Sequence, residues 1–171
     1  KNGVNVAKEV NSVFTSGKFA YIGTDSGSGN EFSIYNIGDP STIGSEVGGL
    51  EIGADVNSVT NYGKYSYIGV ATVSGNDFRI VDVLAPASPS TVGGADIAIG
   101  VNEVFVSGKY LYVANDAIGG TCSGATITGC EFRAYDLSGV DAPSATIGAL
   151  AAGSLNIYDN SLIGNDLSIG N

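Results

Sequence analysis

One sequence pattern occurs three times in this chain and constrains its fold more than any other feature. The pattern reads VNSVFTSGKFAYIGTD at residues 10–25, VNSVTNYGKYSYIGVA at 56–71 and VNEVFVSGKYLYVAND at 101–116. Its period of about 45 residues is typical of four-stranded propeller blades and long for a helical or leucine-rich repeat. Because such repeats bury a core only against one another, the pattern favours a stack of equivalent β-sheets.

The composition indicates a folded, all-β chain. Of 171 residues, 43% are hydrophobic and 14% are charged, which argues against a charge-rich disordered segment. The 26 glycines suit many tight turns, and no long stretch has the apolar spacing of a helix. A net charge of −10 with scattered basic residues argues against a nucleic-acid partner. No apolar run approaches the roughly 18 residues that a membrane span needs.

The repeats divide the chain into three expected blades and a divergent end. We expect four-stranded antiparallel, blade-like repeats at about residues 4–50, 51–97 and 98–150, which together form one domain over residues 1–150. Residues 151–171 depart from the repeat, and we expect a divergent β tail or the start of a following segment there. A degenerate fourth hairpin is the alternative. The chain opens at Lys1, without Met and in mid-pattern, so we expect a processed or excised piece with further sequence upstream.

Each repeat is expected to contain strands A to D. A turn at Gly17, Gly63 or Gly108 joins strands A and B, and it favours glycine because the turn needs a positive φ angle. Strand D follows a proline-containing loop and is expected at the outer edge of its sheet. The expected ranges are 10–15, 56–60 and 101–106 for strand A, from residues 18, 64 and 109 onward for strand B, 31–36, 77–82 and 131–136 for strand C, and 42–47, 91–95 and 146–150 for strand D.

Both faces of each sheet are expected to be apolar, because strand B alternates aromatic with mostly aliphatic residues. A sheet with one face in water would be apolar on one side only, so the sheets must stack. We predict equivalent buried positions for Phe32, Phe78 and Phe132 in strand C, and for Tyr21, Tyr67 and Tyr112 in strand B.

The first and last sheets of such a stack need a cover, since large exposed apolar patches are uncommon on soluble monomers. The candidates are residues 151–171, closure of the first repeat against the third, and another copy of the chain. We favour another copy, because the apolar positions of the tail are few and three blades close a ring poorly.

The two cysteines lie in a connection between strands B and C that is longer in the third repeat than in the first two. The chain has no histidine, and the spacing is not that of a redox C-x-x-C pair. A Cys122–Cys130 disulfide is therefore the leading interpretation, ahead of a zinc site. It implies an oxidising, extracytoplasmic compartment.

The recurring motifs resemble the LVIVD-repeat family, prokaryotic exported proteins predicted to be β-propellers. That family has a Gly turn, a Tyr-Val strand, and a strand ending in Ile-Val-Asp-Val before a proline-containing loop. The matching residues are Ser16-Gly17 with Tyr21-Ile22, Gly63 with Tyr67-Ile68, Ile80-Val81-Asp82-Val83 with Pro86, and Ser107-Gly108 with Tyr112-Val113. The resemblance covers about residues 1–150, is specific for architecture more than for activity, and provides no catalytic residues to transfer to this chain.

The chain departs from the family in three respects: phenylalanine at the first aliphatic position of strand C, the long third loop, and only three full repeats. An ordinary closed propeller has at least four blades. We therefore expect a ring completed by further sequence or by another chain, or an open stack of sheets.

Three recurring sets of residues are candidates for binding chemistry. The acids before strand C could bind calcium, above all in the oxygen-rich segment 25–31, although solvated loop acids are the main expectation. The lysines that open strand B are expected to pair with acids of strand C, Lys64 with Asp82 and Lys109 with Asp136. The strand-B aromatics suit a sugar-stacking platform, but a core between sheets is the expected role. The sets are Glu31, Asp77 and Glu131; Lys18, Lys64 and Lys109; and Phe19, Tyr21, Tyr65, Tyr67, Tyr110 and Tyr112.

No motif places the residues of nucleophilic or acid–base catalysis together, so we expect neither an enzyme nor a bound cofactor. We expect a structural or adhesive repeat domain of a secreted or cell-surface prokaryotic protein that associates with itself or with other surface proteins. The alternative, from another class, is an extracellular module that binds a glycan or calcium.

Overall fold

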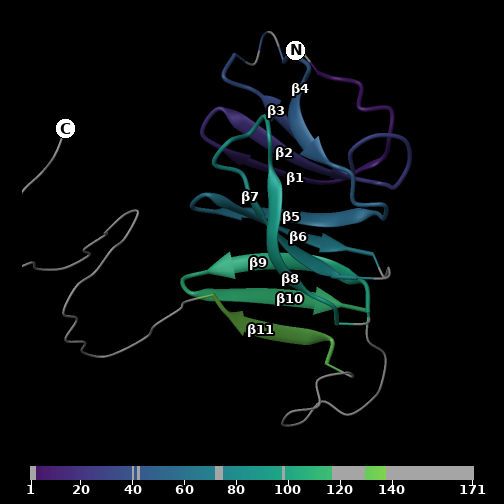
Figure 1. The fold of residues 1–171 in the computed structure, drawn as a ribbon, viewed down its shortest axis with the longest axis vertical. Coiled ribbons are helices and arrows are strands. Elements are labelled where there is room, and N and C mark those ends of the chain that lie inside the picture. Colours follow the sequence, from purple (N-terminus) through teal and green to yellow (C-terminus); the bar gives the residue numbers. More distant parts are fainter. Residues whose placement is uncertain are drawn as a thin grey trace, which may run out of the picture. The chain divides into compact units, whose positions relative to one another are not determined.

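The computed structural model describes residues 3–39, 41, 43–71, 75–97, 99–116 and 130–137. These residues form eleven β-strands in three antiparallel sheets and no helix, so the all-β prediction is confirmed (Figure 1). The chain divides into two compact units, residues 1–138 and 139–171, and every described strand belongs to the first unit. Among the described residues there is accordingly no helix that could cross a membrane. The predicted strand at 146–150 and the tail at 151–171 lie outside the described residues.

The three sheets reproduce the repeat, with neighbouring strands paired in chain order. The first sheet contains β1 (Val10–Ser16), β2 (Phe19–Thr24), β3 (Phe32–Asn36) and β4 (Glu46–Leu50). The second contains β5 (Val56–Tyr62), β6 (Tyr65–Val70), β7 (Phe78–Asp82) and β8 (Ser90–Ala95). The third contains β9 (Val101–Ser107), β10 (Tyr110–Asn115) and β11 (Phe132–Asp136).

The predicted strand D forms the outer edge in the first two sheets, as β4 and β8. The start of β4 was predicted too early, at residue 42. The strand begins at Glu46, which pairs with Tyr35, because β3 ends one residue further on and offers no partner beyond that point.

A glycine turn joins the first two strands of every sheet, as predicted. The φ angle is +58° at Gly17, +61° at Gly63 and +58° at Gly108, a conformation that residues with a Cβ atom rarely adopt. Turn geometry sets the register of a hairpin. Tyr21 and Tyr67 therefore lie at the same level of their sheets, opposite the fifth residue of the preceding strand.

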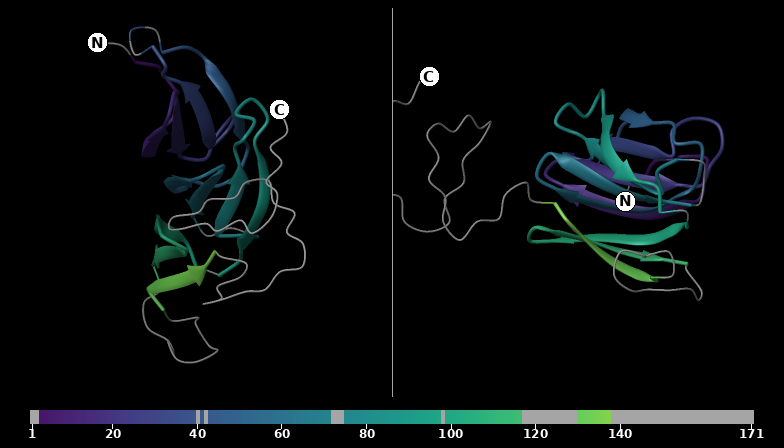
Figure 2. Two further views of the ribbon diagram at one scale, coloured as in Figure 1. Left: turned by 90° about the vertical axis from the view of Figure 1, so that its left-hand side faces the viewer. Right: turned by 60° about the horizontal axis from the view of Figure 1, so that its bottom comes forward.

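The sheets follow one another in chain order, and their first strands β1, β5 and β9 are neighbours (Figure 1, Figure 2). The aromatic faces of the first and second sheets each pack on the aliphatic face of the sheet that follows, which confirms that the sheets stack. The first core contains Tyr21, Phe32 and Ile34 of the first sheet and Val59, Ile68 and Val81 of the second. The second core contains Tyr67 and Phe78 of the second sheet and Val104, Leu111 and Val113 of the third.

Candidate functional site

A bulged asparagine on the first strand of each of the first two sheets reaches the following sheet. The register between the first and second strands shifts at Asn11 and again at Asn57, so each is the extra residue of a β-bulge. Bulges redirect a side chain out of the normal alternation. Asn11 Nδ2 donates a hydrogen bond to the carbonyl oxygen of Val56 at 3.4 Å, and Asn57 Nδ2 donates one to that of Val101 at 2.9 Å.

The serine next to each asparagine makes a second link between the sheets. Ser12 Oγ accepts a hydrogen bond from the backbone amide of Val59 at 3.0 Å, and Ser58 Oγ accepts one from that of Val104 at 3.1 Å. Loss of either hydroxyl would leave a backbone amide without its partner inside the interface, at a cost of about 1–3 kcal/mol.

The residue opposite each of these serines is a glycine, and the lack of a side chain there admits the next sheet. A Cβ atom on Gly23 would lie 2.7 Å from Val56 Cγ1, and one on Gly69 would lie 2.5 Å from Val101 Cγ1. Both distances are far shorter than a van der Waals contact between carbon atoms. The close approach of consecutive sheets therefore requires glycine at these two positions.

Every inner contact thus joins two unlike faces. We call the Asn and Ser of the first strand, with the Gly of the second, the Asn–Ser face of a sheet. We call the two valines that meet it on the first strand of the next sheet the Val face. The Asn–Ser faces are Asn11, Ser12 and Gly23, then Asn57, Ser58 and Gly69; the Val faces are Val56 and Val59, then Val101 and Val104.

The Val face of the first sheet is exposed. Val10 and Val13 are 47% and 62% exposed, whereas their counterparts Val56 and Val59 in the second sheet are 0% and 5% exposed. The difference arises because β1 has no preceding sheet among the described residues, while β5 packs against β1 and β2.

The aromatic face of the third sheet is exposed as well. Phe132 is 65% exposed, whereas the equivalent Phe32 and Phe78 are 0% and 4% exposed. The predicted burial is confirmed for Phe32 and Phe78, and also for Tyr21 and Tyr67. It is wrong for Phe132, and Tyr112 is only half-buried, because no described sheet packs on this face.

These exposed rings form a shallow aromatic surface. The Tyr112 and Phe132 rings lie 14° from parallel with their centroids 5.8 Å apart. With Glu103, Phe105 and Ala114 they line a cavity of about 110 Å³. We call these five residues the aromatic end face.

The recurring acid of the first repeat fixes the connection to the second sheet. Glu31 is buried, and its Oε2 accepts hydrogen bonds from the backbone amides of Ile52 at 2.7 Å and Gly53 at 3.0 Å. Its Oε1 lies 2.9 Å from Lys8 Nζ and accepts a bond from Gly27 at 3.2 Å. Burial alone would raise the pKa of Glu31, but the hydrogen bonds from Lys8 and the three amides outweigh it and lower the pKa.

The acid of the second repeat has the same role. Asp77 is buried and accepts a hydrogen bond from the amide of Ile97 at 2.8 Å, in the connection to the third sheet. The expectation of solvated loop acids is therefore wrong for Glu31 and Asp77, since both bind the connecting backbone, whereas Glu131 is exposed. Donors surround both Glu31 oxygens, which disfavours calcium there. Within the described ranges no group of three or more His, Cys, Asp or Glu side chains could hold a metal ion.

The predicted lysine pairs are confirmed. Lys64 Nζ lies 3.1 Å from Asp82 Oδ2, and Lys109 Nζ lies 3.4 Å from Asp136 Oδ2. The hydrogen bond to Asp82 is the main cause that raises the pKa of Lys64. Each recurring lysine, Lys18 included, also lies over the aromatic ring of the residue that follows it.

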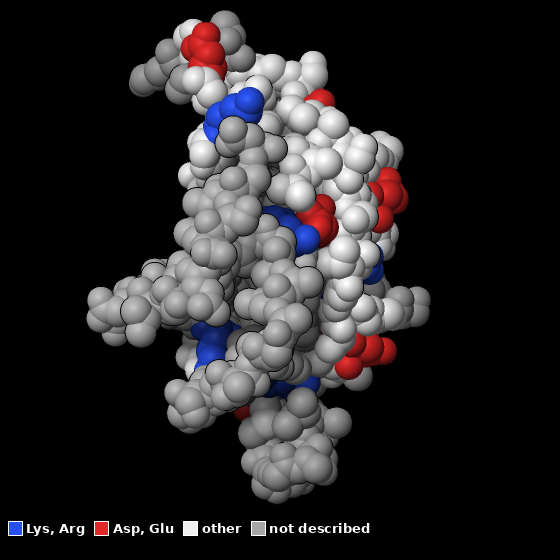
Figure 3. Space-filling model, turned by 60° about the vertical axis from the view of Figure 1, so that its left-hand side comes forward, with Lys and Arg blue, Asp and Glu red and all other residues white. Residues whose placement is uncertain are grey.

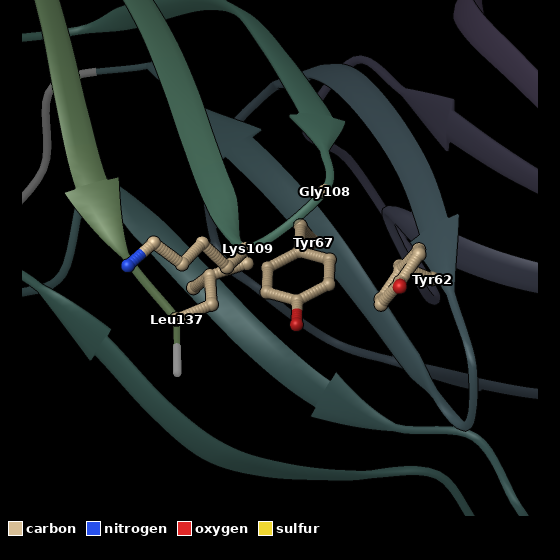
Figure 4. A pocket seen from close by; sticks show the side chains of 5 residues that line it. All are labelled: Tyr62, Tyr67, Gly108, Lys109 and Leu137. Carbon is tan, nitrogen blue, oxygen red and sulfur yellow. The ribbon is translucent and has the colours of Figure 1, made fainter. Parts of the chain in front are cut away.

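Similar grooves lie between consecutive sheets. Tyr62 and Tyr67 of the second sheet and Gly108, Lys109 and Leu137 at the edges of the third line a groove of about 320 Å³ (Figure 4). A groove of about 390 Å³ occupies the corresponding place between the first two sheets. Because Tyr67 is itself buried, it acts as a core residue and not as an open sugar-stacking platform, in agreement with the expected role.

Charged side chains form no single patch on the molecular face seen in Figure 3. Lysine and arginine side chains lie apart from one another there, and aspartate and glutamate form small separate groups. This scatter agrees with the distribution of charge along the sequence.

The family comparison establishes what these repeats are. The model of the LVIVD repeat matches residues 7–45, 53–96 and 100–118, which are more than half of the chain. The chain belongs to the LVIVD-repeat family. Each LVIVD match begins just before the first strand of a sheet, at β1, β5 and β9. The resemblance seen in the motifs is thereby confirmed.

Two computationally designed proteins with solved crystal structures share the fold of this LVIVD chain. Ika4 matches with a TM-score of 0.51 and 14% identity, over 76% of this chain and 67% of its own. Ika8 matches with the same TM-score and identity, over 75% of this chain and 33% of its own. Such low identity is evidence of the fold alone. The comparison with curated proteins finds no match.

The Asn–Ser face was not predicted from the sequence, although the repeats carry a signal for it. The first two LVIVD repeats read Val-Asn-Ser and the third reads Val-Asn-Glu. The glycine at positions 23 and 69 likewise becomes Ala114 in the third repeat. A comparison of the repeats position by position, instead of a search for known motifs, would have found both changes.

The predicted disulfide has one partner within the described residues. Cys130 is buried just before β11, while Cys122 lies outside them. The Cys122–Cys130 bond therefore stays a prediction.

Proposed function

We propose that this chain is a non-enzymatic structural or adhesive repeat domain of a secreted or cell-surface prokaryotic protein. It works by binding other proteins, or further copies of itself, through the outer faces of its end sheets. The observation that carries the proposal is the 65% exposure of Phe132, at a position that is almost completely buried in the two preceding sheets.

The composition of the end faces supports a protein partner. Exposed apolar surface of this kind marks interaction sites on soluble proteins, and aromatic residues are enriched at the centres of protein interfaces. Phe105, Tyr112 and Phe132 supply such residues on the third sheet, and Val10 and Val13 supply branched apolar side chains on the first.

The hydrogen bonds and ion pairs made by the recurring polar residues support a structural role over a catalytic one. Glu31 and Asp77 bind the backbone that connects the sheets, and Lys64 pairs with Asp82. A general acid or base must instead reach a substrate, and these groups are used to fix the fold. Secretion is supported by the family resemblance and by the pair of cysteines.

The aromatic end face also favours a second candidate, a glycan-binding module. The near-parallel rings of Tyr112 and Phe132, with the carboxylate of Glu103 beside them, combine an apolar stacking surface with a hydrogen-bond acceptor. A glycan would bind to a monomer, so the two functions differ in what they do to the particle mass.

Light scattering coupled to gel filtration tests the proposal on the full chain. We expect the mass to rise above that of the 17.2 kDa monomer between low and high micromolar concentration. Phe132→Lys should abolish the rise, because it places a charge in the apolar contact. Leu84→Lys is the matched control, since Leu84 is 73% exposed but lies on neither end face.

A chain that stays monomeric at high micromolar concentration, or one whose association is equally weakened by Leu84→Lys, would contradict the self-association on which this test relies. If glycan-array binding then proves sensitive to Phe132→Lys, the second candidate replaces the first.

A further inference from the structure

The contact between consecutive LVIVD sheets has a direction. In both inner contacts the earlier sheet supplies the Asn–Ser face and the later sheet supplies the Val face. The end sheets therefore present one face of each kind, Val10 and Val13 on the first sheet and the counterpart of the Asn–Ser face on the third. These two faces are not equally able to repeat the contact.

The third sheet keeps the asparagine of the Asn–Ser face but changes its other two residues. Asn102 lies at the same register shift as Asn11, and its amide donates to Asp116 Oδ1 at 2.6 Å, as Asn11 does to Asp25. Glu103 occupies the serine position and Ala114 the glycine position. Glu103 and Ala114 lie directly opposite each other on β9 and β10, so both changes fall at one point of the sheet.

Both changes oppose the binding of a Val face. Ala114 places a Cβ atom where, in the inner contacts, such an atom would lie 2.5–2.7 Å from a valine methyl group. Valine has few rotamers and cannot easily turn that methyl group aside. Glu103 is larger than serine, and it would bring a charge into a contact whose other members are neutral, at a cost in desolvation.

The Val face of the first sheet is unchanged by comparison. Val10 and Val13 are the same residue types as the buried pairs of the second and third sheets, and both are exposed. The backbone groups that take part in the inner contacts correspond here to the Val10 carbonyl and the Val13 amide. The strand β1 thus presents the same side chains and backbone groups that form the contacts between consecutive sheets.

We infer that the Val face of the first sheet binds a sheet of another LVIVD-repeat polypeptide, one that carries Asn, Ser and Gly at the positions of the Asn–Ser face. The third sheet of this chain does not supply that face, so a second copy of the chain is not its partner. The inference rests on the proposed function, because it names the partner of one of the two end faces.

A repaired variant of the full chain provides the probe. Glu103→Ser with Ala114→Gly restores the Asn–Ser face on the third sheet, and Val13→Lys blocks the variant's own Val face so that it cannot polymerise. This triple variant is immobilised, and the wild-type chain is passed over it in a surface binding assay. Val13→Lys alone, without the repair, is the matched immobilised control. Circular dichroism and thermal melting establish that each variant is folded.

We expect wild type to bind the repaired surface more than about tenfold more tightly than the unrepaired one, since each tenfold step needs only 1.4 kcal/mol. Wild type carrying Leu84→Lys should bind the repaired surface equally well, because Leu84 lies outside the Val face. Wild type carrying Val13→Lys should bind the repaired surface no more tightly than the unrepaired one, because any association through Phe132 is the same on both. Asn102→Ala in the repaired surface should weaken the binding of wild type.

The inference is overturned if the repair does not strengthen binding, or if the Val13→Lys analyte binds the repaired surface as tightly as wild type. Equal, Val13-dependent binding to both surfaces would show that a second copy occupies the Val face. That outcome would leave the proposed function standing. Failure of the proposed function is detected separately, by the particle mass and its dependence on Phe132.

Discussion

Phe78 and Phe132 occupy the same position in their repeats and differ in environment. Phe78 packs in the second core, while Phe132 is 65% exposed on the end sheet. We predict that Phe78→Ala lowers the free energy of unfolding by roughly 3–5 kcal/mol, as for other buried aromatic residues. Phe132→Ala should lower it by less than about 1 kcal/mol in the dilute monomer. Urea denaturation of both variants measures the difference, and similar losses would mean that the third sheet is covered.

The ionisation of Glu31 makes the free energy of unfolding depend on pH. Its folded-state pKa is lowered, so its contribution is complete above the unfolded pKa of about 4.3 and is lost as the pH falls through the folded value. We predict that Glu31→Gln costs about 1–3 kcal/mol at neutral pH, and that the gap to wild type narrows below about pH 4.

The exposed Glu51 provides the control, since a Glu51→Gln substitution at the surface should change the free energy of unfolding by less than about 0.5 kcal/mol. Denaturation curves of wild type and both variants, measured between pH 3 and pH 7 in steps of about one pH unit, give the free energies of unfolding to be compared. A constant gap between Glu31→Gln and wild type over this range would contradict the role given to the charge.

At the scale of the strand, the distance between consecutive sheets depends on single glycines. We predict that Gly69→Ala destabilises the chain by about 1–3 kcal/mol, because the added Cβ meets Val101 at 2.5 Å. Gly93→Ala in β8 is the control, since its nearest contact, with Ile80, would be an ordinary 3.5 Å. Thermal unfolding distinguishes the two, and equal melting temperatures would show that the sheets separate easily at this point.

We predict a Cys122–Cys130 disulfide in the long loop of the third repeat. Under non-reducing conditions the oxidised chain should have a mass about 2 Da below that of the reduced chain. Replacing both cysteines by serine should loosen the loop and leave the three sheets folded, because a bridge across a short loop removes little entropy from the unfolded chain. Two free thiols in the oxidised, folded protein would refute the pairing.

Strands with a repeated alternation could be predicted from the sequence, whereas features that depend on a contact with a distant part of the chain could not. The first three strands of each repeat follow from their alternating residues. The turns between the first two strands follow from the glycines that can adopt a positive φ angle, at Gly17, Gly63 and Gly108. The start of β4 depends on the length of β3, which alternation does not encode. The Asn–Ser face was missed for a similar reason, since Ser12 acts through a residue 47 positions away in the chain.

At the scale of the whole molecule, equivalent positions in the repeats predicted equal burial of the strand-B tyrosines and strand-C phenylalanines, and this prediction failed in the third sheet. Tyr21 and Tyr67 are buried because a sheet follows each of them, whereas Tyr112 is half-buried because none follows it among the described residues. Burial in a stack depends on neighbours, which the sequence of one repeat does not specify. The acids Glu31 and Asp77 were misjudged for the same reason, since the backbone that they bind belongs to the next connection.

Amide hydrogen exchange at residue resolution, followed by NMR in a dilute sample, tests the directional contact between sheets most directly. Val59 and Val104 donate to Ser12 and Ser58 across the inner contacts, whereas the Val13 amide belongs to the exposed Val face. We predict slow exchange at Val59 and Val104 and fast exchange at Val13. Ser58→Ala should accelerate exchange at Val104 and leave Val59 protected. Exchange at Val104 as fast as at Val13, or unaltered by Ser58→Ala, would contradict the contact.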